Sequence, residues 1–307
     1  MPYFSVIIPS FNAAATILET LAGLQAQHCT DWEAVVVDDG SMDETRTLVR
    51  HAGRSDTRIR LVRNPGKGPS AARNFGVKEH ARGAVVAFCD ADDIWHPGKL
   101  TGLSGCFEDW SVHGVFGQIG FFRTTPSDAH VFSTVPENDV TISMLLGENP
   151  VCTMSNFAVR RSVFAATGGF NEAMVHNEDL EWLIRLVGGG ARVTGIDSLH
   201  TYYRTSVGGL STDLEAMRAG REQAIATAAG FGVVPSAASH AIHHRYLARR
   251  ALRLNGAPAY ALKQAVSGIL KSPRGFFSPF RRGGLTLAGS LLAPFLPRPL
   301  RRNLFSR

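Results

Sequence analysis

The sequence predicts an α/β fold: a mostly parallel sheet flanked by helices, followed by a helical, basic C-terminal extension. Short β-branched runs alternate with helical periodicity over the first hundred residues, as a parallel sheet covered by helices requires. Beyond Thr212 the chain is mostly helical and rich in alanine. With 307 residues, 44% of them hydrophobic, the chain is long enough to build its core without metals or disulfides.

Each expected element follows from a local pattern. Residues 4–8, 33–37, 58–62 and 84–89 are expected to be strands, and apolar residues at one helical face predict a helix after the first strand, at Ile17, Leu18, Leu21 and Leu24. Ser41 and Glu44 have the spacing of a capping box, which predicts the start of the second helix. Pro69 predicts the start of the third, and a later helix is expected to begin near Glu178.

The cysteines and the N-terminus indicate a cytoplasmic protein. The four cysteines are far apart, and no CxxC, HExxH or similar spacing predicts a zinc site. The chain runs from Met1 directly into a short apolar strand, without a basic leader. We therefore expect a cytoplasmic location, extending to the inner face of the membrane.

The charge is divided unevenly along the chain. The net charge is +6, but residues 223–307 contain 13 Lys or Arg and no Asp or Glu. Within this tail, residues 285–296 are apolar and flanked by arginines; twelve residues are too few to span a bilayer. Two interpretations stay open: an interfacial segment on anionic membrane, or a packed helix with a solvated basic fringe.

Acidic residues follow two of the predicted strands. The carboxyl ends of parallel strands lie at the same edge of a sheet, and we call this edge the rim. Five carboxylates are therefore expected on the rim: Asp38, Asp39, Asp90, Asp92 and Asp93. Helix capping would explain one aspartate per loop, but five like charges repel each other unless a cation or bound donors compensate them. Hard carboxylate oxygens suit Mg²⁺ or Mn²⁺ held together with substrate phosphates. The rim is therefore expected to bind a divalent ion and a diphosphate.

Three further residues extend this expectation. Arg73 follows a glycine loop and is either a forked donor to the same phosphates or an ordinary surface arginine. Glu178 and Asp179 begin a helix, where they favour the positive end of its dipole. Opposite a metal-bound diphosphate, a carboxylate from this second region would also provide a general base for a hydroxyl.

Several of these segments resemble one family in order. Residues 5–12, 36–45 and 90–93 resemble the opening of family 2 glycosyltransferases with the Rossmann-like GT-A fold, and residues 160–164, 168–170 and 178–179 resemble the acceptor half. The resemblance covers about residues 4–205. It implies a GT-A domain over 1–206, divided into a nucleotide-sugar-binding half (1–95) and an acceptor half (96–206), and a separate helical region over 207–307.

The resemblance also implies residue roles. Pro9 and Phe11 would border the nucleotide base and Asp39 would accept a hydrogen bond from it, while Arg73 matches an arginine that contacts the donor nucleotide. In the DxD-like segment, Asp90 would bind the ribose or the donor sugar, and Asp92 would bind the divalent metal ion.

On the acceptor side, Asp179 looks like the catalytic base of an inverting transfer, with Glu178 beside it in the acceptor site. The expected reaction moves a sugar from a nucleotide-sugar, a UDP-sugar by preference, to a saccharide or lipid-linked acceptor in surface polysaccharide or glycolipid assembly. The chain lacks the QxxRW motif and the membrane spans of similar processive synthases, which favours single transfer. Two alternatives stay open: a nucleotidyltransferase, and a nucleic-acid-binding protein that uses the basic tail, although no recognition motif supports a nucleic-acid partner.

Overall fold

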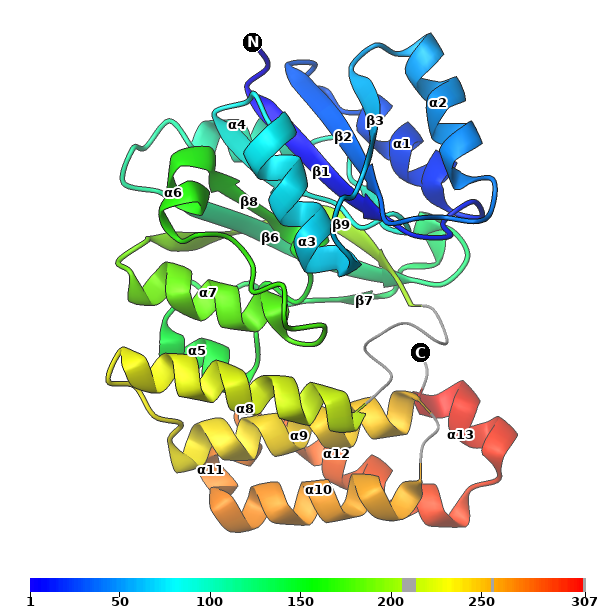
Figure 1. Cartoon of the computed structure of the whole chain (residues 1–307). Helices are drawn as coiled ribbons and strands as arrows, with labels where there is room; N and C mark the ends of the chain where they lie inside the picture. Colours follow the sequence, from blue (N-terminus) through cyan, green and yellow to red (C-terminus); the bar gives the residue numbers. More distant parts are fainter. Residues whose placement is uncertain (206–213, 255–256, 306–307) are drawn as a thin grey trace. The chain divides into compact units, whose positions relative to one another are not determined.

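The computed structural model describes residues 1–205, 214–254 and 257–305 (Figure 1). Its contacts divide the chain into two units, which are described separately: residues 1–140 with 150–206, and residues 141–149 with 207–307. The short helix α5 (Ile142–Gly147) groups with the C-terminal helices, although in sequence it interrupts the first unit.

The first unit contains one mixed sheet. Its described strands run in the order β3-β2-β1-β4-β8-β6-β9-β5, and β7 pairs with β6. The first four are parallel and confirm the predicted strands: β1 (Phe4–Ser10), β2 (Trp32–Asp38), β3 (Ile59–Arg63) and β4 (Val85–Phe88). The others are β5 (Ile94–Trp95), β6 (Gly114–Phe122), β7 (Val131–Phe132), β8 (Phe157–Arg160) and β9 (Val193–Arg204). The predicted α/β class is thus confirmed, with antiparallel pairs concentrated in the second half.

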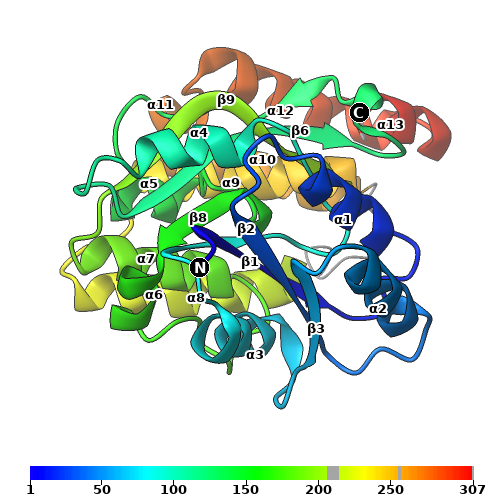
Figure 2. The same cartoon turned by 90° about the horizontal axis from the view of Figure 1, so that it is seen from above.

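Helices cover both faces of this sheet (Figure 2). Phe4, Val6 and Ile8 pack on one face with α1 (Ile17–Gln25), α2 (Thr45–Ser55) and α4 (Lys99–Cys106). The opposite face carries α3 (Gly68–Phe75), which continues as a π-helical turn at Gly76–His80, together with α6 (Arg161–Ala166) and α7 (Glu178–Gly188). A Cβ at Gly76 would lie 2.6 Å from Ile7 Cγ2, so glycine allows this helical segment to reach the sheet.

Three helix starts were expected from the sequence, and one of them is wrong. Pro69 lies in the first turn of α3 and Glu178 begins α7, as predicted. The second helix, however, begins at Thr45, and Glu44 caps it without a side-chain hydrogen bond. The Ser41 hydroxyl instead accepts a hydrogen bond from the Asn12 amide (3.0 Å), so it serves the neighbouring loop.

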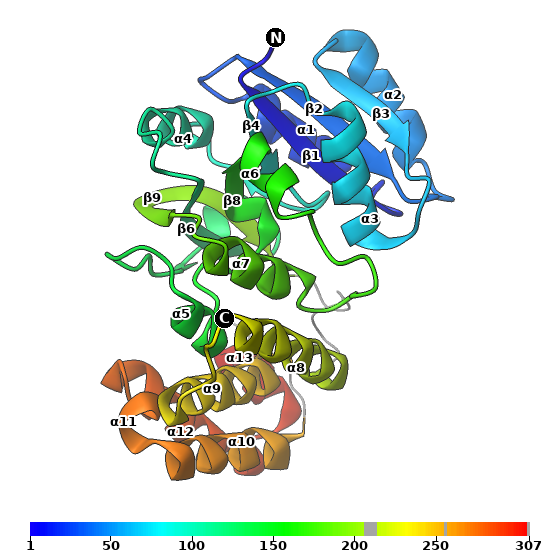
Figure 3. The same cartoon turned by 60° about the vertical axis from the view of Figure 1, so that its left-hand side comes forward.

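The second unit is helical. Besides α5 it contains α8 (Leu214–Gly230), α9 (Ala237–Arg253), α10 (Pro258–Lys271), α11 (Pro273–Phe276), α12 (Phe280–Leu292) and α13 (Arg298–Phe305). Helices α9 and α10 run side by side (Figures 1 and 3), and small side chains form their shared core: Ala241, Ala248 and Ala265, with Phe276 beside them. Among the described residues, no helix combines the length and apolarity that crossing a bilayer requires.

Candidate active site

The loops after β1, β2 and β4 meet at one edge of the sheet, because these three strands are parallel neighbours. Side chains tie the loops together. The Ser41 hydroxyl accepts from the Asn12 amide, and Thr16 Oγ1 donates to the carbonyl of Ala91 (2.8 Å). Residues far apart in sequence are therefore held on a single rim.

Asp39 lies on this rim inside a fixed set of donors. Its carboxylate accepts hydrogen bonds from Asn64 Nδ2 (2.7 Å) and the Gly68 amide (3.0 Å), and it pairs with Lys67 Nζ (3.1 Å). The same ammonium lies 4.6 Å from the ring centre of Phe11, which is half-exposed and follows Pro9 at the end of β1. The half-exposed ring of Phe11 therefore lies beside the polar cluster of Asp39 and Lys67.

Two of the five carboxylates expected on the rim, Asp38 and Asp93, have side chains buried inside the protein. Asp38 is buried and accepts from the amides of Gly40 and Ser41 (3.2 Å each). Asp93 is also buried, and its Oδ1 accepts from the Arg204 amide (2.9 Å). Both carboxylates satisfy backbone donors of the rim itself, since buried amides need acceptors.

Arg73 joins the two predicted acidic regions. Its side chain is buried, with Nη2 2.7 Å from Asp90 Oδ1 and Nη1 3.0 Å from Glu178 Oε1. Burial alone would lower the pKa of Arg73, but the two carboxylates outweigh it and raise the pKa. Arg73 was expected to contact the donor nucleotide; in this structure its two terminal nitrogens bind protein carboxylates.

Two further residues contact Asp90: Ser155, in the 3₁₀ turn Met154–Asn156, and Thr153, which directly precedes this turn. Thr153 Oγ1 donates to Asp90 Oδ2 (3.2 Å), and the Asp90 amide donates to Ser155 Oγ (2.8 Å). Together with Arg73, these contacts fix the carboxylate in one orientation.

The first turn of α7 is anchored by an aromatic cluster. Trp182 is buried and packs against Phe88, Phe157, Phe164 and Phe170, with ring centres 4.7 to 6.0 Å apart. This anchor holds the preceding residues of the helix against the sheet.

Asp179 lies in this anchored turn with an altered acidity. Burial, and then the charge of Glu178, raise its pKa to about 7, while Arg73 opposes the shift. Asp90 also raises it, so the four charged groups share one electrostatic environment. A carboxylate whose pKa lies near neutrality can accept a proton at physiological pH.

Asp92 is the carboxylate best suited to a cation. Burial and the charge of Asp90 raise its pKa to about 6, while Arg204 opposes the shift and donates through Nε to the Asp92 carbonyl (2.9 Å). A divalent ion would relieve both penalties, and Mg²⁺ commonly uses only one or two carboxylates plus substrate phosphates. The side chains therefore fit a metal, although residues 1–205, 214–254 and 257–305 hold no cluster of three or more His, Cys, Asp or Glu set for one.

A family model described as "Glycosyl transferase family 2" matches residues 5–168, more than half of the chain. The chain belongs to this family. The prediction made from its ordered motifs is thus confirmed.

Known proteins agree with this membership. UDP-Glc:alpha-D-GlcNAc-diphosphoundecaprenol beta-1,3-glucosyltransferase WfgD of Escherichia coli is 43% identical over 97 residues, covering 31% of this chain and 37% of WfgD. The chain spans about two fifths of the length of the first curated relatives that it matches.

Solved structures share the fold. The mannosyltransferase PcManGT of Pyrobaculum calidifontis, in complex with GDP-Man and Mn²⁺, has a TM-score of 0.61 at 21% identity, covering 99% of this chain and 84% of PcManGT. Residues 1–349 of TarS from S. aureus, in complex with UDP-GlcNAc, have a TM-score of 0.59 at 19% identity, covering 95% of this chain and 81% of that one.

Sequence reasoning missed several residues of this family 2 glycosyltransferase. Lys99 is buried beneath the DxD-like loop, where it donates to Thr201 Oγ1 (3.1 Å) and burial lowers its pKa to about 7. Thr153, Ser155 and Arg204 also serve the rim. None lies in a motif, and the hydrogen bonds that join Thr153, Ser155 and Arg204 to Asp90 and Asp92 span 63 to 112 residues of sequence, so no local pattern identifies them.

Proposed function

We propose that the chain transfers a sugar, with inversion, from a nucleotide-sugar to an acceptor hydroxyl. The supporting observation is the junction of Asp90, Arg73, Glu178 and Asp179, which brings a donor-side acid beside a base of raised pKa. The junction joins a loop after β4 to the first turn of α7, as a reaction between two substrates requires.

The donor binds along the rim. Phe11 and Pro9 border the base, and Asp39 accepts a hydrogen bond from it through a lone pair that its three protein donors leave available. Asp90 holds the ribose or the donor sugar. Arg73 acts on the donor by orienting Asp90.

Asp92 holds a divalent ion, Mg²⁺ or Mn²⁺. When bound, the ion neutralises charge on the departing nucleoside diphosphate. The proposal rests on the raised pKa of Asp92, since a bound cation would offset the burial and the charge of Asp90 that cause it. The PcManGT complex with GDP-Man and Mn²⁺ supports the proposal by analogy of fold.

Asp179 removes the proton from the attacking hydroxyl. Burial strengthens its basicity, and Glu178 both adds negative charge and lies on the acceptor side. The positive charge of Arg73 opposes the rise in the pKa of Asp179 and so favours the ionised, basic form of this carboxyl.

The acceptor is a saccharide or a lipid-linked sugar in surface polysaccharide or glycolipid assembly, and the donor is a UDP-sugar. The name of the relative WfgD includes both UDP-Glc and a diphosphoundecaprenol acceptor, which supports this choice.

The second unit offers a surface for such a lipid. Helix α12 buries small residues, which are Gly283, Thr286, Gly289 and Ser290, and exposes large apolar ones, which are Phe280, Leu285, Leu291 and Leu292. Phe295 follows with 84% exposure, and the whole tail beyond Glu222 carries no acidic residue. An apolar face with basic neighbours is typical of a helix at an anionic membrane surface.

The enzymatic proposal is tested with a panel of nucleotide-sugars, measuring released diphosphate with Mn²⁺, with Mg²⁺ and with EDTA. Asp179→Asn is expected to keep donor binding and lose transfer by about 10² to 10⁴, the usual contribution of a positioned base. Asp197→Asn, on an exposed residue of β9, is the matched control and should keep full turnover. Equal turnover in both variants would remove the assignment.

The membrane proposal is tested by flotation of the full chain on vesicles containing phosphatidylglycerol. Leu292→Ser/Phe295→Ser should lose flotation, whereas Trp110→Ser, which removes an equally exposed apolar side chain from the first unit, should retain it. Equal flotation of all three proteins would refute the assignment of this face to lipid.

A further inference from the structure

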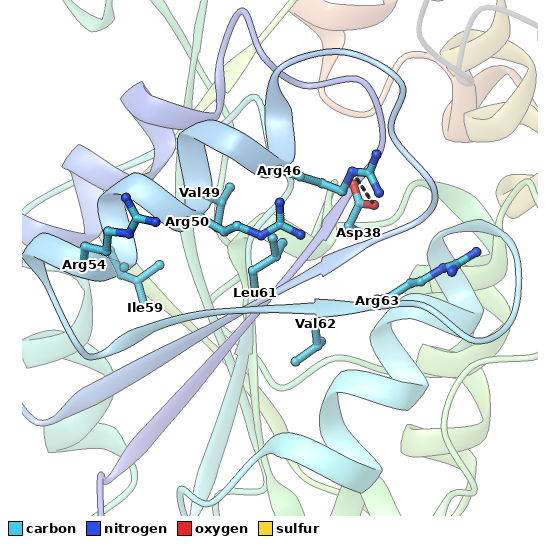
Figure 4. Close-up of a pocket in the computed structure, with 10 residues that line it drawn as sticks. Asp38, Arg46, Val49, Arg50, Arg54, Ile59, Leu61, Val62 and Arg63 are labelled. Carbon is cyan, nitrogen blue, oxygen red and sulfur yellow. Dashed lines mark ion pairs between the residues drawn. The ribbon is translucent and has the colours of Figure 1, made fainter.

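A pocket of about 590 Å³ lies between α2 and the edge strand β3, and four arginines and one acid, Asp38, provide its charged lining (Figure 4). Arg46, Arg50 and Arg54 line it from the helix and Arg63 from the strand. Val49 and Ile59 are buried at its apolar floor. Its volume lies within the usual range of sites for small ligands.

The three helical arginines follow one another at four-residue intervals. This spacing places them in one row on α2, about 12 Å from first to last at 1.5 Å per residue. The helix contains no acidic residue to offset them, and Arg46 lies in its first turn, where the dipole disfavours a cation. Like charges four residues apart also repel, so the row weakens the free helix.

Little within the protein neutralises this row. Arg46 lies 3.9 Å from Asp38, whose carboxylate already accepts from backbone amides. In the ranges that the structure describes, Arg50, Arg54 and Arg63 have no carboxylate within ion-pair distance. Asp38 thus offsets part of the charge of Arg46, and the pocket keeps an excess of exposed positive charge from the other three arginines.

A glycine keeps the helix close to the strand at one end of the pocket. A Cβ at Gly53 would lie 2.8 Å from the carbonyl oxygen of Ile59, so any larger residue would push α2 away from β3. The close approach keeps α2 packed along β3, with Arg54 and Arg63 at opposite ends of the pocket and Arg46 and Arg50 between them (Figure 4).

We propose that this pocket binds a soluble ligand carrying two or more phosphate groups, each held by a guanidinium fork. Planar guanidinium groups match phosphate oxygens in pairs, which a point charge does not. The pocket is concave and is lined from two elements, so it suits a discrete ligand better than a flat lipid surface. The inference uses residues outside the proposed donor and acceptor sites and does not depend on them.

The probe is inorganic tripolyphosphate, titrated calorimetrically into the full chain without metal or nucleotide. Binding is expected, weaker for inorganic phosphate and weaker at high salt, since exposed charges are screened. Arg50→Gln/Arg54→Gln should bind about a hundredfold more weakly, at roughly tenfold per charged hydrogen-bonding group lost. Arg274→Gln/Arg281→Gln, which removes two exposed arginines of the second unit, is the matched control and should bind like the unmodified chain.

A second arm separates a free phosphate from a lipid headgroup. Vesicles containing phosphatidylglycerol should float the Arg50→Gln/Arg54→Gln protein as well as the unmodified one. Loss of flotation in that variant without tripolyphosphate binding by the unmodified chain would assign the row to membrane and overturn the proposal. Equal tripolyphosphate affinity in the Arg50→Gln/Arg54→Gln protein and in the Arg274→Gln/Arg281→Gln control would also overturn the proposal. If the double variant does not fold, Arg63→Gln on β3 makes the same test with one fork removed.

Discussion

Replacing Arg73 by methionine is the most direct test of how the site is built. The change keeps an apolar stem near Phe170, whose ring centre lies 5.5 Å from the guanidinium carbon, but it removes the cation between Asp90 and Glu178. Two carboxylates that are mostly withdrawn from water then lose their shared partner. Leaving a buried charge unpaired costs about 3–5 kcal/mol.

The exposure of the partners sets where in that range the loss falls. The side chain of Glu178 is 12% exposed and that of Asp90 is 28% exposed, so water partly relieves Asp90. We therefore expect a loss near the lower end, about 3 kcal/mol. The loss arises because two carboxylates keep their negative charge without the arginine. Adding Glu178→Gln to the Arg73→Met protein should therefore recover part of the lost free energy of unfolding.

Tryptophan fluorescence during urea unfolding measures this loss. All four tryptophans, Trp32, Trp95, Trp110 and Trp182, lie in the first unit, so the signal reports on the unit that contains Arg73. Arg192→Met is the matched control: Arg192 pairs with Asp109 and Asp139, but all three side chains are well exposed, so a much smaller loss is expected. Equal losses in the two variants, or no recovery with Glu178→Gln, would refute the buried junction.

Three further predictions concern the acids. Glu178→Gln should shift the acidic limb of the transfer rate to lower pH, because the charge of Glu178 helps raise the pKa of Asp179 to about 7; a pH–rate profile measures the shift. Asp179→Asn should stabilise the chain at pH 8 but not at pH 4, by at most about 4 kcal/mol, in urea unfolding at the two pH values. The sign follows because a raised folded-state pKa gives stability that is lost as pH rises from about 4 to about 7. Asp92→Asn should raise the Mn²⁺ concentration needed for half-maximal transfer, whereas Asp197→Asn should not.

Local patterns predicted the elements that depend on local physics. The β-branched runs of β1 to β4 and the apolar spacing of α1 depend on nearest neighbours in sequence, and they formed where expected. The start of α2 did not, because the Ser41 hydroxyl is taken by an amide 29 residues away. A capping box requires that the hydroxyl accept from an amide of its own helix. Whether an amide from a distant segment takes that hydroxyl instead depends on tertiary structure.

The site divides in the same way. Asp90, Asp92 and Asp179 were identified from motifs, but the inward turn of Asp38 and Asp93 depends on which backbone amides lack acceptors. That question is settled only when distant strands pair. Arg73 shows the limit most clearly, since its nearer partner is 17 residues away and its farther one 105.

The position of Arg73 also links stability to function. A buried ion pair of this kind is weak evidence for stability, because desolvation offsets much of the attraction. Its value lies in geometry: one planar group with two donor directions fixes Asp90 and Glu178 relative to each other. In the proposed reaction, those two acids belong to the donor and acceptor sides. Arg73→Lys is therefore expected to retain more stability than Arg73→Met yet lose transfer, because a single ammonium cannot hold both carboxylates in the same relative position. Full transfer by the lysine variant would show that charge alone, without the fork, is sufficient.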